Sequence, residues 1–265
     1  MKATNPVTLI QRAGLRDLSR NKWIVAYTAA FALIGEGLFR FGGTGPQVVL
    51  SLLNVVLLVV PLVSLVFGTI HVYASREFVE LLLAQPVPRS RLFAGLYLGL
   101  AVPLAGAFVV GTTIPFALHL RSGANASALA ALFGAGIALS LVFSALAAWI
   151  ALSTDDRLKG VGFALGVWLL STIVYDGVVL AAVAAFADWP LEKPMLAMML
   201  ANPVDVARVT VLTRLDASAL MGYTGALFQH TFGTLAGTSV AAAALIAWCA
   251  APLSLAARRF RVRDF

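Results

Sequence analysis

The chain has 265 residues, of which 60% are hydrophobic and only 12% are charged. Soluble domains carry about 25% charged residues, so this composition excludes a water-exposed globular surface and favours an all-α membrane protein. The formal net charge is +7, but the basic residues stand in short clusters beside apolar runs, which is typical of residues that orient membrane helices, so we expect membrane lipid and no nucleic acid as a partner.

The first predicted element covers residues 1–22, where two faces alternate at helical spacing. Apolar or small residues follow one face and arginines follow another (Val7, Ile10, Gly14 and Leu18; Arg12, Arg16 and Arg20). This pattern predicts an amphipathic helix that lies in the membrane surface, with an ordinary solvated helix as the alternative.

Six apolar stretches follow, each of about 20 residues or more, which is the length that crosses a bilayer. They are residues 23–42, 48–74, 92–118, 128–152, 160–187 and 232–257. Near the end of the first stretch, Glu36 and Arg40 stand four residues apart in the order that favours an ion pair, and we interpret them as a local anchor. We expect residues 1–265 to form a single transmembrane domain with six spanning helices.

The distribution of lysine and arginine predicts the orientation. If the N-terminus lies inside, the outer connections hold only a few of the 19 Lys and Arg residues, namely Arg40, Arg121, Lys193, Arg208 and Arg214. Because positive residues favour the cytoplasmic side, we expect a multi-pass protein of the bacterial inner (plasma) membrane, with its N-terminus and C-terminus in the cytoplasm.

Residues 75–91, between the second and third spans, predict a short helix on the cytoplasmic face. Glu77 and Glu80 would lie in its first turn, where the helix dipole favours negative charge, and Pro86 and Pro88 would end it. Two interpretations stay open: a loop that follows the membrane surface, and a coupling helix that docks on a cytoplasmic partner. In the second interpretation the coupling residues are Arg76, Glu77, Phe78, Glu80 and Leu81.

Residues 188–231, between the fifth and sixth spans, are too apolar for an ordinary outer loop and too often charged for a span. Asn202 can cap a helix, Pro203 suits its first position, and Asp205 lies near the positive end of its dipole. We expect a re-entrant hairpin of two short half-helices, starting at Pro203 and at about Asp216, that rests on the other helices in the outer leaflet.

Asp176 lies near the middle of the fifth span, next to Tyr175. A carboxylic acid at that depth is costly and normally faces a bundle interior or a water-filled cavity. Asp176 is either a structural group, bonded to Thr172 or to a neighbouring helix, or part of a translocation path or a dimer interface.

Catalytic chemistry is not expected. The sequence has no phosphate-binding loop of the Gly-x-x-x-x-Gly-Lys-Ser/Thr type, which excludes ATP binding by that route. Its histidines fall on separate segments and Cys249 is its only cysteine, so we expect no metal site of these residues and no cofactor in this chain. The outer methionines are either packing residues or thioether ligands for copper(I) (Met195, Met198, Met199 and Met221).

The whole layout resembles a type-2 ABC exporter permease, and local stretches narrow the resemblance. They are Glu-Leu-Leu-Leu-Ala-Gln-Pro-Val at 80–87, Gly-Val-Trp-Leu-Leu at 166–170 followed by Tyr175 and Asp176, Leu-Ala-Asn-Pro-Val-Asp at 200–205, and the basic ending at 258–265. Together they are similar to the NosY-type permease subunit of the transporter that matures nitrous oxide reductase.

The resemblance implies a homodimer, two cytoplasmic ABC ATPase subunits that bind ATP and Mg²⁺, and a periplasmic accessory protein. The residues expected to contact that protein are Asn202, Pro203, Asp205 and Arg208. The resemblance also implies that the chain is not an enzyme, and that its ATPase drives export or a conformational signal in maturing the copper site of nitrous oxide reductase. The alternative is a mechanotransmission or scaffolding subunit that moves no solute.

Overall fold

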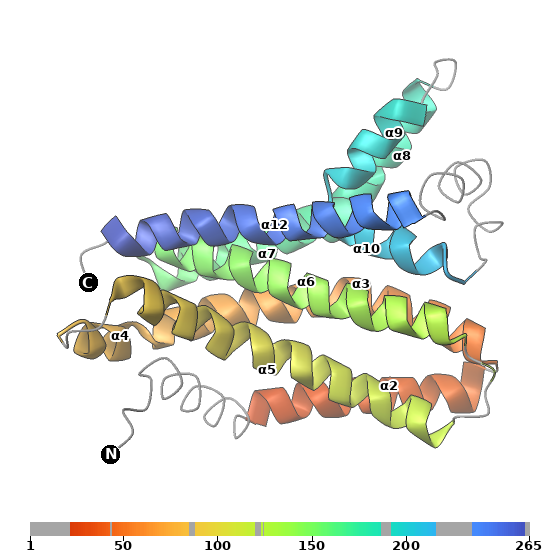
Figure 1. The fold of residues 1–265 in the computed structure, drawn as a ribbon, viewed down its shortest axis with the longest axis horizontal. Helices are drawn as coiled ribbons and strands as arrows, with labels where there is room; N and C mark the ends of the chain where they lie inside the picture. Colours follow the sequence, from red (N-terminus) through yellow and green to blue (C-terminus); the bar gives the residue numbers. More distant parts are fainter. Residues whose placement is uncertain are drawn as a thin grey trace.

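The computed structural model describes residues 22–42, 44–84, 88–119, 123, 125–186, 192–215 and 235–262, and every element within them is helical (Figure 1). The all-α fold is therefore confirmed for these residues. The surface helix predicted for residues 1–22 lies outside them, except for Lys22, which begins the first described helix. The elements are α2 (Lys22–Gly42), α3 (Gly45–Ala74), α4 (Arg76–Leu83), α5 (Arg89–Leu118), α6 (Ala126–Ser153), α7 (Arg157–Leu169), the π-helical segment η1 (Leu170–Val174), α8 (Tyr175–Ala185), α9 (Glu192–Leu200), α10 (Pro203–Leu212) and α12 (Leu235–Val262).

Among the described residues, six helical stretches are long and apolar enough to cross a membrane, and each overlaps one of the six predicted stretches. The fourth span starts at Ala126, before the predicted stretch, because Asn125 caps it by accepting a hydrogen bond from the backbone N–H of Ser127 at 3.0 Å. Near the end of the first span, Arg40 Nε donates to Glu36 Oε1 at 2.8 Å, so the predicted ion pair is confirmed.

The helices α3 and α6 form the centre of the bundle. They pack along each other, α6 also packs along α12 and α5, and α2 packs along α5. Between them lie fully buried aromatic side chains, among which the rings of Phe31 and Phe108 meet edge to face with their centroids 5.3 Å apart. Because lipid tails are as apolar as these side chains, close van der Waals packing holds the helices together.

Gly111 lets α5 approach the backbone of α2. A Cβ atom at this position would lie 2.5 Å from the carbonyl oxygen of Thr28 and 3.0 Å from the Cβ of Phe31. The carbonyl belongs to the helix backbone and cannot turn aside. We therefore expect Gly111→Ala to lower the free energy of unfolding by about 1–3 kcal/mol, the usual cost of overpacking, measured as a lower melting temperature in detergent.

Gly106 on the same helix provides the matched control, since a Cβ atom there would meet nothing within 4 Å. Gly106→Ala should leave the melting temperature unchanged or raise it slightly, because alanine favours the helix over glycine. Equal melting temperatures for the two alanine variants would show that α5 and α2 are not in close contact at Gly111.

The fifth span is interrupted by η1, so that it consists of α7, the π-helical segment and α8. It is the least buried of the six spans, and α8 projects away from the other helices together with α9 (Figure 1). Gly162 and Gly166 on α7 stand at the small-x-x-x-small spacing of close helix contacts, yet a Cβ atom at either would meet nothing within 4 Å. The other described helices of the chain therefore cover little of this span.

The segment after the fifth span contains α9 and α10, which form a pair bent by 107°. Helix α10 starts at Pro203, as the sequence predicts, and it is buried against α3, α6 and α12. Helix α9, over Glu192–Leu200, was not predicted. The second half-helix, expected from about Asp216, lies outside the described residues.

Candidate functional site

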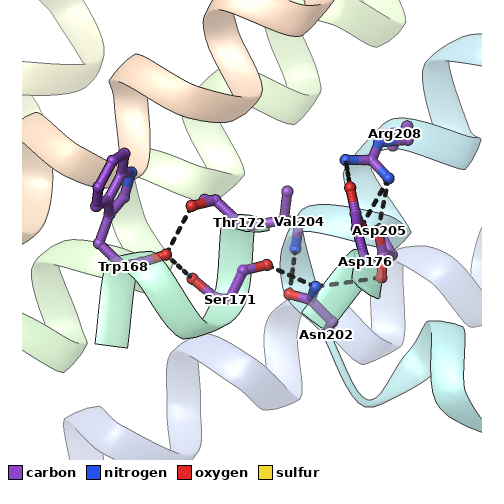
Figure 2. Close-up of polar contacts among 8 residues, drawn as sticks. All are labelled: Trp168, Ser171, Thr172, Asp176, Asn202, Val204, Asp205 and Arg208. Atoms are coloured by element: carbon purple, nitrogen blue, oxygen red, sulfur yellow. Dashed lines mark hydrogen bonds and ion pairs between the residues drawn. The ribbon is translucent and has the colours of Figure 1, made fainter. Parts of the chain in front are cut away.

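Arg208 on α10 joins two acidic side chains (Figure 2). Its Nη1 and Nη2 donate to the two carboxylate oxygens of Asp176 at 3.0 and 2.9 Å, and Nη1 also donates to Asp205 Oδ1 at 3.1 Å. Asp176 lies in the first turn of α8, and Asp205 lies in the first turn of α10. The guanidinium fork therefore clamps the fifth span to the buried half-helix through charge-assisted hydrogen bonds.

Asn202 makes a second link between the same elements. Its Nδ2 donates to the carbonyl oxygen of Ser171 at 2.8 Å and to Asp205 Oδ2 at 3.1 Å, while its Oδ1 accepts from the N–H of Val204 at 3.1 Å and caps α10. Ser171 lies within η1, where the i→i+5 pattern interrupts the α-helical ladder and lets a carbonyl accept from outside the helix. The π-helical segment and the start of α10 thus form one hydrogen-bonded unit.

Trp168 anchors the chain just before η1. Its Nε1 donates to the carbonyl oxygen of Leu58 in α3 at 3.0 Å, and its own carbonyl accepts from Thr172 Oγ1 at 2.7 Å and from Ser171 Oγ at 3.1 Å. Thr172 therefore bonds within its own helix, and of the two structural partners considered for Asp176 it is not the one observed. The other structural partner proposed for Asp176, a neighbouring helix, is the one observed.

The clamp of Asp176, Arg208 and Asp205 is partly shielded from water. Their side chains are 38%, 29% and 12% exposed. Tyr175, beside Asp176, donates its hydroxyl to the carbonyl oxygen of Met198 at 2.6 Å and so ties α8 to α9. Because Arg208 and Asp205 lie three residues apart on the same helix, only the ion pair with Asp176 joins α10 to α8, and it would break if these two helices moved apart.

Most of the residues expected to contact a periplasmic protein are covered by other parts of this chain. Asn202, Pro203 and Asp205 are buried, and Arg208 is held in the clamp. The contact with a partner stays a prediction. In this conformation it would have to be made by neighbours of these buried side chains.

Arg76 begins α4 at the opposite end of the bundle. Its Nη2 donates to the carbonyl oxygens of Ala151 and Thr154 at 2.9 and 2.8 Å, and its Nη1 donates to that of Asp155 at 3.1 Å. Its guanidinium also lies 4.3 Å from the centre of the Tyr73 ring. The carbonyls stand at and after the last turn of α6, where helical partners are missing. Arg76 therefore positions α4 against the end of α6.

The outer face of α4 carries apolar and acidic side chains. Val79 is buried in a cluster with residues of α3, α5, α6 and α12. On the other side Phe78 and Leu81 are 52% and 72% exposed, and Glu77 and Glu80 are exposed beside them. Exposed apolar side chains with a charged rim are typical of a protein interaction surface.

In the described part of the chain, no three His, Cys, Asp or Glu side chains lie close enough to share a metal ion. Of the outer methionines, Met195 and Met199 are buried, and Met199 packs with Val206 and Ala241. This is the packing role proposed for them. Met221 lies outside the described residues.

Sequence reasoning singled out Asp176 and Arg208 separately but missed that they form a pair, and it missed Trp168 and Ser171 as their support. One signal was present. Asp176 is the only charged residue in the stretch 160–187, so it requires a partner from another segment, although this does not say which one.

Comparisons with known proteins bear on the whole chain. The pattern of a family described as "ABC-2 family transporter protein" matches residues 10–265. The chain is similar to two proteins described as "Probable ABC transporter permease protein NosY". The one from Pseudomonas aeruginosa is 27% identical over 275 residues, which covers 97% of this chain and 98% of that protein. The one from Stutzerimonas stutzeri is 28% identical over 233 residues, which covers 81% and 84%.

Proposed function

Because the chain belongs to the ABC-2 family of transporter proteins, we propose that it couples ATP hydrolysis by a separate cytoplasmic ATPase to conformational change in the membrane, with α4 as the docking helix. The chain is a multi-pass permease subunit of the inner membrane, and the family works with an ATPase partner. In this proposal the ATPase binds ATP and Mg²⁺, both termini of the permease are cytoplasmic, and the permease itself carries out no catalysis.

The observation that supports coupling is the division of α4 into a fixed side and an exposed side. Arg76 and Val79 hold the helix against the bundle, through carbonyl contacts and apolar packing. Phe78, Leu81 and the adjacent carboxylates face away from it. A helix that is rigidly attached on one side can pass a displacement from a partner on the other side into α3 and α6.

Phe78→Ala combined with Leu81→Ala should abolish most ATPase binding. Truncating a central interface residue typically costs about 2 kcal/mol or more, so the double variant should lose about a hundredfold or more in affinity. The measurement is a pull-down and a binding titration between the detergent-solubilised permease and its purified ATPase.

The matched control is Leu33→Ala with Phe41→Ala, which truncates two side chains that are 72% and 93% exposed on α2. Affinity for the ATPase should be that of the wild type, and both double variants should insert into the membrane normally. If the variant truncated at Phe78 and Leu81 bound the ATPase with wild-type affinity, α4 would not be the docking helix.

A second copy of the chain is the partner we propose along the fifth span. This span is the least covered of the six, and Gly162 and Gly166 leave open space at the spacing that lets two helix backbones approach. Asp176 and Tyr175 would then lie at the dimer interface or beside a path through it. A complex whose measured mass contains only one permease would contradict the homodimer.

The narrower proposal is a role in maturing the copper site of nitrous oxide reductase, with a periplasmic accessory protein. It is supported by the NosY description of both relatives and by the resemblance over residues 80–87, 166–176 and 200–205. A reductase that carries its full copper content in a strain lacking this chain would contradict it. If maturation fails without the chain but vesicles containing the complex move no solute, the subunit acts by mechanotransmission.

A further inference from the structure

Two neighbouring cavities lie along α12 and together form a groove beside this helix. One part, of about 500 Å³, lies between α6 and α12 and is lined by small and apolar side chains, including Ala135, Ala138 and Leu245. A second part, of about 510 Å³, lies between α5 and α12. Ala250 and Leu253 line both parts, so the two lie next to each other.

The chemistry of the groove changes along its length. The part beside α6 is lined by alanine, glycine and leucine with Cys249, Thr210 and Thr238. The part beside α5 ends at Arg89, Ser90 and Arg261, in the basic end of the bundle. Arg89 Nη1 donates to the backbone carbonyl oxygen of Arg261 at 2.8 Å, which holds the Arg89 side chain against the end of α12.

The dimensions fit one leaflet of a bilayer. From Arg261 back to Cys249 the rise of α12 is about 18 Å, at about 1.5 Å per residue. Half of the hydrocarbon core of a bilayer is about 15 Å thick. An acyl chain whose head group lies at the arginines would therefore end in the alanine-lined part of the groove.

We propose that this groove binds a phospholipid with an anionic head group, whose phosphate lies at Arg89 and Arg261 and whose acyl chain follows α12 past Leu253 and Ala250. Basic residues at the membrane surface attract anionic lipids, and small side chains between helices leave the width that an acyl chain requires. A second copy fits the site less well. Two chains related by an axis along the membrane normal would bring the same arginines together at the same depth.

The test is native mass spectrometry of the full chain in a mild detergent, titrated with dioleoyl phosphatidylglycerol or with dioleoyl phosphatidylcholine. The wild type should hold one phosphatidylglycerol at a half-saturating concentration about tenfold lower than for phosphatidylcholine, because two arginines act on the head-group charge. Arg89→Gln with Arg261→Gln should remove this preference. Arg91→Gln with Arg259→Gln changes the net charge equally at exposed residues that do not line the groove, and should keep the preference.

Ala250→Phe provides an independent arm, because Ala250 is exposed and lines both parts of the groove. It should weaken binding of both lipids about equally while the melting temperature stays near that of the wild type. The proposal is overturned if the wild type binds the two lipids equally, or if both glutamine pairs change the preference to the same extent. It is also overturned if Ala250→Phe dissociates a dimer without changing lipid retention, since a second copy would then cover the groove.

Discussion

Arg208→Met should destabilise the folded chain by about 2–4 kcal/mol, because it leaves Asp176 and Asp205 facing each other without a cation. Breaking a fully buried ion pair from one side typically costs about 3–5 kcal/mol. The expected range is lower because the Asp176 side chain is 38% exposed and water can screen it. The measurement is the thermal unfolding midpoint in detergent, together with the yield of inserted protein.

Asp176→Asn tests whether the charge or the shape of the clamp matters. Asparagine keeps a hydrogen-bond acceptor for Arg208 and should cost only about 1 kcal/mol. Added to Arg208→Met it should restore part of the lost stability, because it removes one of two facing charges. If Asp176 acts through its charge in the transport cycle, the asparagine variant should bind the ATPase normally and fail to complement in cells.

The matched control is Arg214→Met on the same segment, where Arg214 Nη2 donates to the neutral hydroxyl of Thr238 at 3.0 Å. Loss of a single bond of this kind should cost about 1.5 kcal/mol, the low end for a charged donor, and should leave no unpaired charge behind. Equal destabilisation by Arg208→Met and Arg214→Met would show that the clamp is no stronger than an ordinary contact. Full complementation by Asp176→Asn would leave the clamp as a structural feature only.

Arg76→Met should uncouple the permease from its ATPase while leaving most of the binding intact. The substitution removes a charged group that donates to the carbonyl oxygens of Ala151, Thr154 and Asp155, yet it leaves the exposed side of α4 unchanged. Charge-assisted hydrogen bonds contribute about 1.5–3 kcal/mol each when they are well shielded. The helix should therefore loosen from α6, and stimulation of the ATPase by the permease should fall about tenfold or more.

The measurement is ATP hydrolysis by the complex in proteoliposomes, compared with the affinity of the two subunits. Arg91→Met, at an exposed position near the start of α5, is the control and should change neither quantity. If Arg76→Met lost as much affinity for the ATPase as the double variant of Phe78 and Leu81, Arg76 itself would contact the ATPase. Its contacts with α6 would then not explain the loss of coupling.

The spans could be predicted because the requirement for a span is local. A helix needs about 20 apolar residues in a row to cross a bilayer, and whether a segment has them can be read from that segment alone. The start of α10 was predictable for the same reason, since Asn202 caps and Pro203 opens the helix through contacts within a few residues.

The other features depend on contacts between distant residues. Helix α9 is tied from outside by Tyr175 and by Trp248, whose Nε1 donates to the carbonyl oxygen of Leu200 at 3.0 Å. The clamp depends on the 107° bend between α9 and α10. No periodicity in one segment reports such a bend, so the pairing of Asp176 with Arg208 could not be placed in advance.

The π-helical segment η1 determines which way the residues of α8 face around the axis of the fifth span. Compared with an uninterrupted α-helix, one inserted residue rotates the following turns by about 100°. With this rotation Asp176 faces Arg208, and Tyr175 reaches the carbonyl of Met198. Winding η1 as a regular α-helix without removing a residue would turn the acid by about 100° to another side. Removing one residue as well would bring the acid back toward Arg208. The winding of this span, as well as the identity of its residues, thus positions the clamp.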